Sequence, residues 1–325
     1  MKVLITGGAG FLGQRLARKL LARGYLTGRD DMRRDITQLT LIDMVAAPDF
    51  GDARVQVITG DIAEEAMLRQ VIDRDTDSIF HLAAVVSGQA EADFDLGMRI
   101  NLDASRSLLD VCRACGHQPK VIFTSSVAVY GGRLPVVVQD STALNPQSSY
   151  GTQKAMSELL LNDYSRRGFV DGRVLRLPTI SVRPGKPNQA ASSFASGIIR
   201  EPLGGEAAVC PVSPSLRLWL LSPRAAIDAL IAGHEIAAAA LHGSRTINLP
   251  GVSVTVGEMV AALTAVAGPA PAALISFVAN PAVERIVNSW PGAWDSTRAI
   301  ALGLRGDDSF ESIVRAYMEE ELGIL

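Results

Sequence analysis

A tyrosine and a lysine stand four residues apart in the segment Tyr150-Gly151-Thr152-Gln153-Lys154. On a helix this spacing places both side chains on the same face. A phenol with an ordinary pKa of about 10 is a poor base at neutral pH, and a nearby ammonium favours the phenolate and brings it toward the working range. The same spacing also arises by chance on helix surfaces. The pair therefore predicts acid/base chemistry only where the fold places it beside a reacting carbon.

A third candidate, Ser126, follows the apolar run Lys120–Ser125, which is predicted to be a strand. The carboxyl ends of parallel strands are where ligands bind in open α/β folds. Tyr150 opens the helix after this strand, so Ser126 can hydrogen-bond the same substrate oxygen as Tyr150. Together with Lys154, these hydroxyls predict a site that polarises a substrate hydroxyl beside a nicotinamide and supports hydride transfer at a carbinol carbon.

A glycine-rich loop joins the first predicted strand to the first predicted helix, Phe11–Arg23. Gly7 allows the tight turn, and Gly10 lets the backbone approach a pyrophosphate at the helix N-terminus. Gly13 permits close packing of the helix on the sheet. Glycines at this spacing are a weak signal alone, but the order strand, glycine loop and helix strongly predicts a dinucleotide site.

The partner of the adenosine ribose is expected to be an acid at the end of the second strand. Spacing alone suggests Asp30, but Asp43 ends the apolar strand Leu39–Asp43, and the polar insertion Gly24–Gln38 explains its late position. A carboxylate there accepts hydrogen bonds from ribose hydroxyls and repels a phosphate, which predicts NAD rather than NADP. Two alternatives stay open: Asp43 only ends a strand, or a phosphate is bound by Arg29, Arg33 and Arg34.

Short apolar runs alternate with helical periodicity through the first half of the chain. This order predicts an α/β protein with a Rossmann-type, doubly wound parallel sheet. The expected strands are Lys2–Ile5, Leu39–Asp43, Val55–Thr59, Ser78–Leu82, Lys120–Ser125 and Arg173–Leu177, and the expected helices are Phe11–Arg23, Ala63–Asp73, Phe94–Cys115 and Tyr150–Arg167. The insertion Gly24–Gln38 is interpreted as a solvated loop.

After Leu177 the sequence becomes rich in proline, which does not suit the interior of a sheet. A long alanine-rich helix is predicted over Arg224–Leu241, and a further helix begins with a capping box at Thr255 and ends at Gly268. We therefore expect an NAD-binding domain of residues 1–178 plus about 224–250. The remainder, about 179–223 plus 251–325, is expected to form a smaller substrate-binding lobe.

The composition is ordinary for an α/β enzyme of 325 residues, with 48% hydrophobic and 20% charged residues and a net charge of −3. No strong positive field favours nucleic acid or an anionic membrane, and no apolar run is long enough to cross a bilayer. The start Met1-Lys2-Val3 leaves no room for a signal peptide, so a cytoplasmic location is expected. Cys112 and Cys115 are interpreted as helix packing, with a redox or metal motif as the alternative, and no metal is expected.

The chain resembles the extended short-chain dehydrogenase/reductase family almost from end to end. The resemblance is carried by Gly7/Gly10/Gly13, Asp61-Ile62, His81-Leu82-Ala83-Ala84, Asn101, Thr124-Ser125-Ser126 and Tyr150/Lys154. It implies that Asp61 and Ile62 flank the adenine, Ala83 lines the cofactor and Pro178 borders the nicotinamide. It also implies NAD contacts from Phe11, Leu12 and Ser125, a ribose contact from Lys154, and a catalytic Asn101. A homodimer formed by the helices Phe94–Cys115 and Tyr150–Arg167 is expected, and His81 is interpreted as packing, with a catalytic histidine as the alternative.

The residues beside the catalytic hydroxyls limit the reaction. The family's dehydratases carry an Asp-Glu pair where this chain has Val127 and Ala128, which cannot move protons. The family's nucleotide-sugar epimerases carry an asparagine for the nucleotide where this chain has Thr179. Net oxidation by hydride transfer is therefore expected.

Two loops, Ala84–Glu91 and Ser181–Asn188, resemble those of family members that oxidise small 2-hydroxy sugar acids with NAD. The carboxylate of such a substrate needs a cation, and the planar fork of an arginine suits it. Arg183 is the first candidate and Lys186 the second, with solvated loop charges as the alternative, and Ser87 is expected to contact substrate hydroxyls. Two other functions stay open: a nucleotide-sugar epimerase that keeps NAD bound and releases no NADH, and a non-catalytic NAD-sensing regulator.

Overall fold

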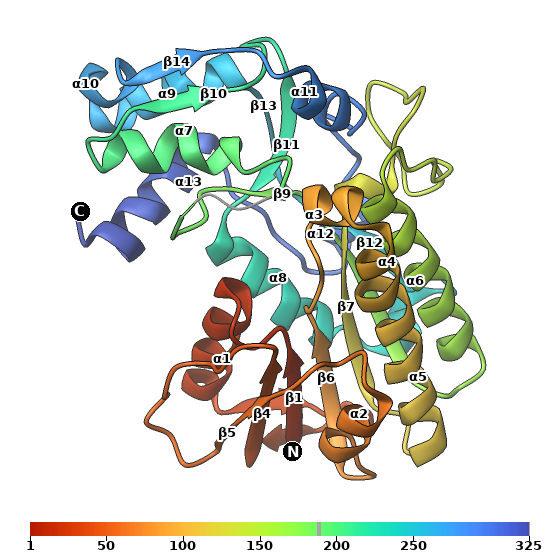
Figure 1. Ribbon diagram of the computed structural model, residues 1–325. Helices are drawn as coiled ribbons and strands as arrows, with labels where there is room; N and C mark the ends of the chain where they lie inside the picture. The colour runs from red at the N-terminus through yellow and green to blue at the C-terminus, as the bar shows by residue number, and fades with distance from the viewer. Residues whose placement is uncertain (187–189, 325) are drawn as a thin grey trace.

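The computed structural model describes residues 1–186 and 190–324, and its centre is a seven-stranded parallel sheet (Figure 1). The strand order is β12-β8-β7-β6-β1-β4-β5. The strands are β1 (Lys2–Thr6), β4 (Gln38–Asp43), β5 (Val55–Thr59), β6 (Thr76–His81), β7 (Lys120–Ser126), β8 (Asp171–Leu177) and β12 (Thr246–Asn248). The predicted Rossmann-type fold is confirmed.

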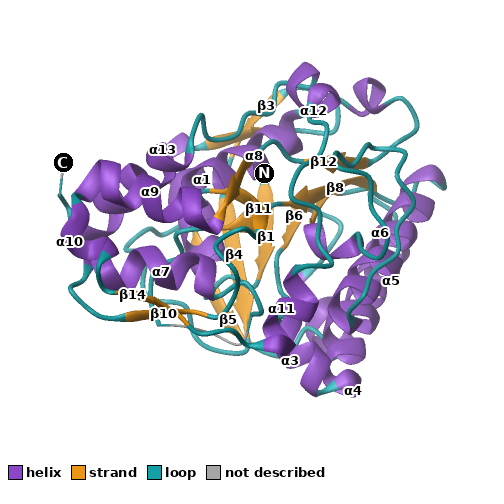
Figure 2. Cartoon of the chain, turned by 90° about the horizontal axis from the view of Figure 1, so that it is seen from above, coloured by secondary structure: helices purple, strands orange, loops and turns teal. Residues whose placement is uncertain are grey.

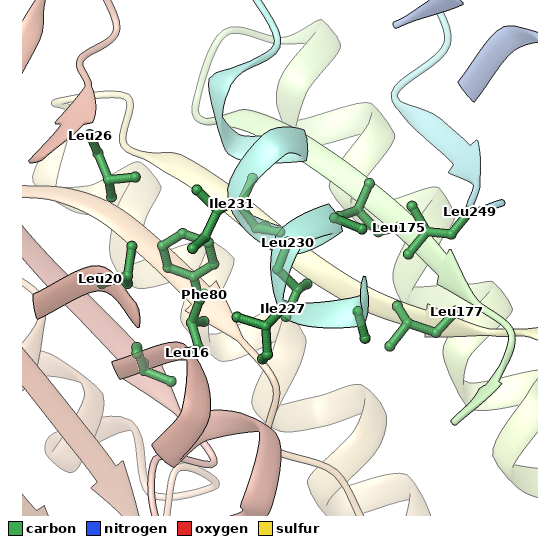
Figure 3. Close-up of a cluster of buried hydrophobic side chains, with 14 of the residues drawn as sticks. Leu16, Leu20, Leu26, Phe80, Leu175, Leu177, Ile227, Leu230, Ile231 and Leu249 are labelled. Carbon is green, nitrogen blue, oxygen red and sulfur yellow. The ribbon is translucent and has the colours of Figure 1, made fainter. Parts of the chain in front are cut away.

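Alternate side chains of the strands enter two separate cores, one on each face of the sheet. Val3 and Ile5 of β1 pack with α1 (Phe11–Arg23) and α8 (Pro223–Glu235), whereas Leu4 packs on the opposite face. Figure 3 shows Phe80 and Leu175 among the helix side chains of the first core. Full burial of such a side chain stabilises the fold by about 1.5–3 kcal/mol.

The second core lies beneath α2 (Glu65–Val71), α5 (Ala104–Cys115) and α6 (Ser149–Arg166). Figure 2 shows α5 and α6 side by side on one flank of the sheet. Two short helices, α3 (Ser87–Ala92) and α4 (Phe94–Gly97), precede α5. A π-helical turn at Met98–Asp103 joins α4 to α5, so the helix predicted from Phe94 to Cys115 is present with one widened turn.

The insertion Gly24–Gln38 is a β-hairpin and not a solvated loop. Strands β2 (Tyr25–Thr27) and β3 (Arg33–Asp35) pair antiparallel, and Leu26 is fully buried in the first core. The Glu235 carboxylate accepts hydrogen bonds from the Thr27 amide (3.0 Å) and hydroxyl (2.6 Å). The segment is polar, and its two strands have three residues each. Strands this short do not show the alternation of apolar and polar residues by which a strand is predicted.

A smaller lobe lies above the carboxyl ends of the sheet (Figure 1). Its strands are β9 (Thr179–Ile180), β11 (Arg217–Leu221) and β13 (Val252–Thr255), with the separate pair β10 (Ala208–Cys210) and β14 (Ile275–Phe277). Its helices are α7 (Phe194–Leu203), α9 (Val256–Ala267), α10 (Pro269–Ala272), α11 (Pro281–Val287) and α13 (Phe310–Tyr317), while α12 (Thr297–Ala301) packs against β12. In the described ranges, no helix has the length and apolar character to cross a membrane.

Two expectations for the C-terminal half differ in outcome. The capping box at Thr255 and the end of α9 at Gly268 are confirmed. The helix predicted over Arg224–Leu241 is shorter, because α8 ends at Glu235 and a separate 3-10 turn spans Ala238–Leu241. Alanine-rich sequence favours helix throughout this segment, but Ile236 adopts an extended conformation and interrupts it.

Candidate active site

A cavity of about 310 Å³ lies where the carboxyl ends of the strands meet the lobe. The glycine loop and the ends of β6, β7 and β8 form its floor, and residues of the lobe cover it. Its lining includes Gly7, Gly10, Phe11, Leu12, Gly13, Ser87, Ser125, Ser126, Tyr150, Lys154, Pro178, Thr179, Arg183, Ser192 and Trp290. The cavity therefore brings the predicted cofactor loop and the predicted acid/base residues together.

The glycine loop fits a dinucleotide. Gly7 has a positive φ of 72°, and a Cβ there would lie 2.8 Å from the Ala83 amide nitrogen. A Cβ on Gly13 would collide with the Gly7 carbonyl oxygen. Gly10 caps α1, and no side chain hydrogen-bonds the first turn of that helix from the cap position. The positive end of α1 is therefore left for an anion such as a pyrophosphate.

Asp43 lies beside this loop, at the end of β4. Its carboxylate accepts a hydrogen bond from the Ala9 amide (3.1 Å), which places it next to the cofactor loop. Asp30 instead pairs with Arg34 in the hairpin. Arg29 donates to the His117 carbonyl before β7, so the hairpin lies at the amino edge of the sheet. The alternative of a phosphate held by the hairpin arginines is therefore wrong.

Only some of the other residues expected to bind the cofactor line the cavity. Pro178 and Ser125 line the cavity, and the buried Ser125 hydroxyl has no hydrogen-bond partner within the described residues. Ala83 abuts Gly7 and donates its amide to the Thr6 hydroxyl (3.2 Å). Asp61 and Ile62 lie outside the cavity lining: Asp61 pairs with Arg99 (2.6 Å), and Ile62 is buried in the second core.

The first turn of α6 places Tyr150 against the end of β7. The Ser148 hydroxyl caps the helix by accepting from the Gly151 amide (3.2 Å). A Cβ on Gly151 would collide with the Ala128 carbonyl oxygen, so a glycine after Tyr150 allows this close approach. The Ser126 hydroxyl lies close enough to the Tyr150 phenol to lower its pKa, and that both bond one substrate oxygen stays a prediction.

Burial controls the charge of the catalytic pair. Burial raises the pKa of Tyr150 to about 12, against the lowering effects of the Ser126 hydrogen bond and the Arg183 charge. Burial also lowers the pKa of Lys154 to about 7, while Glu158 one turn further along α6 raises it. The Arg183 charge favours the Tyr150 phenolate, so a second cation acts beside the predicted contribution of Lys154, which stays a prediction.

Lys154 lines the cavity, and its amino group packs over aromatic rings. Its Nζ lies 4.6 Å from the centre of the Phe123 ring, a favourable cation–π distance, and 5.8 Å from that of Tyr150. No acidic side chain of the described residues forms an ion pair with it, because both oxygens of Glu158 accept from Arg176 (2.9 and 2.6 Å). Together with the orphaned Ser125 hydroxyl, this ammonium fits the hydroxyl groups of a nucleotide ribose.

Asn101 supports the site from outside the cavity. Its side chain accepts from the Val85 amide (2.8 Å) and donates to the Val85 carbonyl (3.1 Å) and the Gln153 side chain (2.8 Å). Asn101 therefore joins the loop after β6 to α6, and the catalytic role that the resemblance implies stays a prediction. His81 bonds the hydroxyls of Thr6 and Ser105, and burial lowers its pKa to about 3, in agreement with a packing role.

The substrate end of the cavity is built from distant segments. The buried Ser87 hydroxyl accepts from the Ala191 amide (3.2 Å) and lines the cavity. Arg183 also lines it, whereas Lys186 is exposed and lies outside the lining. Pro187 and Asn188 of the same loop lie outside the described residues. The sequence analysis missed Ser192 and Trp290 as lining residues, because no local motif marks them.

Comparison with known proteins identifies the family. The model of the NAD dependent epimerase/dehydratase family matches residues 3–219. The D-erythronate dehydrogenase of Cupriavidus necator is 66% identical over 98% of this chain and 98% of its own length, and that of Haemophilus influenzae is 50% identical over 99% and 100%. A crystal structure named as a nucleoside-diphosphate-sugar epimerase from Agrobacterium tumefaciens has a TM-score of 0.93 at 44% identity, covering 99% of this chain and 95% of that one. The chain therefore belongs to the NAD dependent epimerase/dehydratase family.

The position of Asp43 predicts the choice of cofactor. Wild-type protein should bind NAD at least about tenfold more tightly than NADP, a difference of about 1.4 kcal/mol. Asp43→Ala should narrow this ratio because it removes the carboxylate beside the glycine loop. The matched change Asp30→Ala in the hairpin should leave the ratio unchanged. Titration of each variant with both cofactors measures it, and equal affinities in the wild type would contradict the assignment.

The geometry of Tyr150 and Lys154 predicts that their substitutions affect turnover and NAD binding differently. Tyr150→Phe removes only the ionisable hydroxyl, so turnover should fall roughly 100-fold or more while NAD still binds. Lys154→Met should weaken both turnover and NAD binding, because its ammonium is directed at the cofactor. Steady-state kinetics and NAD titration distinguish the two variants. Near-normal turnover of Tyr150→Phe would show that another group moves the proton.

Proposed function

We propose that the protein oxidises D-erythronate to the 2-oxo acid, with NAD as the hydride acceptor. The two D-erythronate dehydrogenase relatives at 66% and 50% identity over almost the whole chain support this reaction. The reaction removes a hydride from C2 and a proton from the 2-hydroxyl group, and it yields NADH and a proton. It requires a base for the hydroxyl proton and a cation for the substrate carboxylate.

The residues of the cavity supply both groups. Tyr150 accepts the proton of the 2-hydroxyl, and the Ser126 hydroxyl orients the same oxygen. A bound NAD would supply the hydride acceptor and the positive charge of a nicotinamide ring. Because the pKa of Tyr150 is about 12, added positive charge favours the phenolate that the reaction needs. Lys154 holds the nicotinamide ribose in this proposal.

The observation that carries the substrate assignment is the environment of Arg183. Its guanidinium lines the same cavity as Tyr150, and no acidic side chain in residues 1–186 and 190–324 forms an ion pair with it. Burial lowers the pKa of Arg183 to about 10, so it remains charged at neutral pH. A cation in the cavity lining without an acidic partner favours a negatively charged ligand. Arginine can bind a carboxylate through two parallel hydrogen bonds. Ser87 is placed to contact the remaining hydroxyls.

A nucleotide-sugar epimerase is the second candidate, because the solved structure with a TM-score of 0.93 carries that name. Such an enzyme would return the hydride to its substrate and release no NADH. Val127 and Ala128 are buried apolar residues beside Ser126, so they offer no further acid or base. Thr179 lines the cavity where the family's epimerases use an asparagine for the nucleotide, and this favours the oxidation of a small acid.

We further propose how the chain is organised in solution. Residues 1–178 with about 224–250 bind NAD, and about 179–223 with 251–325 form the lobe that covers the substrate. Two copies pair through the helices α4, α5 and α6, on which Phe94 (58% exposed) and Leu159 (66% exposed) lie at the surface. The three cysteines are free thiols, which suits the reducing cytoplasm.

The proposed reaction predicts NADH formation from D-erythronate and NAD, followed by absorbance. Arg183→Ala should raise the KM for erythronate about 10- to 150-fold, equivalent to about 1.5–3 kcal/mol for a lost charge-assisted contact. Lys186→Ala is the matched control: it removes a cation from the exposed part of the same loop and should change KM less than about twofold.

Three results would change this account. Protein that is inert toward four-carbon aldonates but interconverts a UDP-hexose without net NADH would establish the epimerase. Unchanged kinetics in Arg183→Ala would place the carboxylate site elsewhere and leave the reaction intact. A large effect of Lys186→Ala would move that site to Lys186.

The proposed dimer predicts that a charged residue in its apolar interface will halve the molecular mass of the protein in solution. Leu159→Glu buries a carboxylate in the α4–α6 interface, so the protein should become monomeric in light scattering after size exclusion. Ile300→Glu on α12, at a position that is 49% exposed, is the control and should remain dimeric. A wild-type protein that is monomeric at micromolar concentration would refute the dimer.

A further inference from the structure

The backbone of Arg183 is held at both of its polar groups by side chains of one helix. Strand β9 ends at Ile180, and the Ser181 amide still donates to the Leu221 carbonyl of β11 (3.0 Å), whereas Arg183, two residues further on, is held by side chains. The Arg183 amide donates to the Ser196 hydroxyl (3.0 Å), and its carbonyl accepts from Nη1 of Arg200 (2.7 Å). Ser196 and Arg200 are four residues apart on α7 and therefore lie on the same face. We call these two residues the α7 clamp.

The clamp is built on a rigid base. Ser196 is fully buried, and α7 packs Phe194, Ile198 and Ile199 into the core of the lobe. Nη2 of Arg200 donates to the Glu201 carboxylate (2.6 Å), in an ion pair whose side chains are only 10% and 16% exposed. The guanidinium is thereby fixed in the orientation that reaches the Arg183 carbonyl. Interior packing of this kind resists small displacements.

The clamp also leaves the Arg183 side chain available. Both contacts use backbone atoms of Arg183, and Oε1 of Glu201, the acid on the same helix, accepts from Arg200. The Arg183 guanidinium therefore enters the cavity without an acidic partner among residues 1–186 and 190–324. A cation that is already positioned loses little conformational entropy when a carboxylate binds, and this raises affinity.

We propose that Ser196 and Arg200 are positioning residues that determine affinity for the substrate carboxylate by fixing the backbone of Arg183. The inference rests on the proposed function, in which Arg183 binds that carboxylate. Neither clamp residue is among the residues that line the cavity. Loss of either should therefore change KM for the acid while the chemistry at Tyr150 and the binding of NAD continue.

The test is a kinetic cycle on the full-length enzyme with D-erythronate and NAD. Arg200→Met should raise the KM for erythronate roughly 5- to 50-fold, and Ser196→Ala roughly 3- to 10-fold, with kcat and the KM for NAD within about threefold of the wild type. The double variant Arg183→Ala/Arg200→Met should have the same KM as Arg183→Ala alone within about twofold, because the clamp acts through Arg183.

Two matched controls remove similar contacts elsewhere. Arg298→Met deletes an arginine that donates to the carbonyls of Thr246 and Ser244, and Ser165→Ala deletes a buried hydroxyl that accepts from the Gly172 amide. Both should leave the KM for erythronate unchanged, even where thermal unfolding shows lower stability. Ser196→Ala is a small change without loss of charge, so it tests the clamp if Arg200→Met does not fold.

The outcomes separate this inference from the proposed function. If Arg183→Ala raises KM but Ser196→Ala and Arg200→Met do not, the clamp is refuted and the carboxylate site stands. If the effects of Arg183→Ala and Arg200→Met multiply, Arg200 acts by its own charge and the inference is equally refuted. If Arg183→Ala itself has no effect, the proposed carboxylate site is refuted.

Discussion

Two basic side chains at one edge of the sheet, the buried Lys154 and the half-buried Arg183, have no acidic ion-pair partner within the described residues. An uncompensated charge in a protein interior costs several kcal/mol, so other interactions must maintain it. Arg176 takes both oxygens of Glu158, one turn from Lys154, and Arg200 takes Oε1 of Glu201. We propose that the positive charge of the cavity serves two ligand groups: ribose hydroxyls at Lys154 and a carboxylate at Arg183.

The fold brings these charges to one place from separate parts of the chain. The parallel sheet collects the glycine loop and the ends of β6, β7 and β8 at the same edge, where α6 adds Tyr150 and Lys154. The lobe adds Arg183, Ser192 and Trp290 and covers the cavity. Burial beneath the lobe raises the pKa of Tyr150 and lowers that of Lys154, so the same covering that binds the substrate also sets the charge of the catalytic pair. Substrate binding and proton transfer are thus linked through exclusion of water.

The parts of this site that the sequence predicts are local in the chain. Gly7, Gly10 and Gly13 are close together and follow one strand, and Tyr150 and Lys154 share one helix face, so spacing alone reveals them. The lining by Trp290 depends on long-range packing and has no local pattern. The hairpin at Tyr25–Asp35 was missed for a related reason: its docking depends on Glu235, more than two hundred residues later. The catalytic role implied for Asn101 rests on its motif, which does not show that the side chain contacts Val85 and Gln153.

The central claim is that Arg183 makes the cavity specific for a carboxylate, and calorimetric titration of the enzyme–NADH complex tests it most directly. NADH prevents oxidation during the measurement. D-Erythronate and erythritol share a four-carbon polyol skeleton, and only erythronate carries a carboxylate. The account predicts that erythronate binds at least about tenfold more tightly than erythritol, a difference of about 1.4 kcal/mol or more. Equal affinities for the two compounds, or tight binding of a UDP-hexose in place of erythronate, would contradict it.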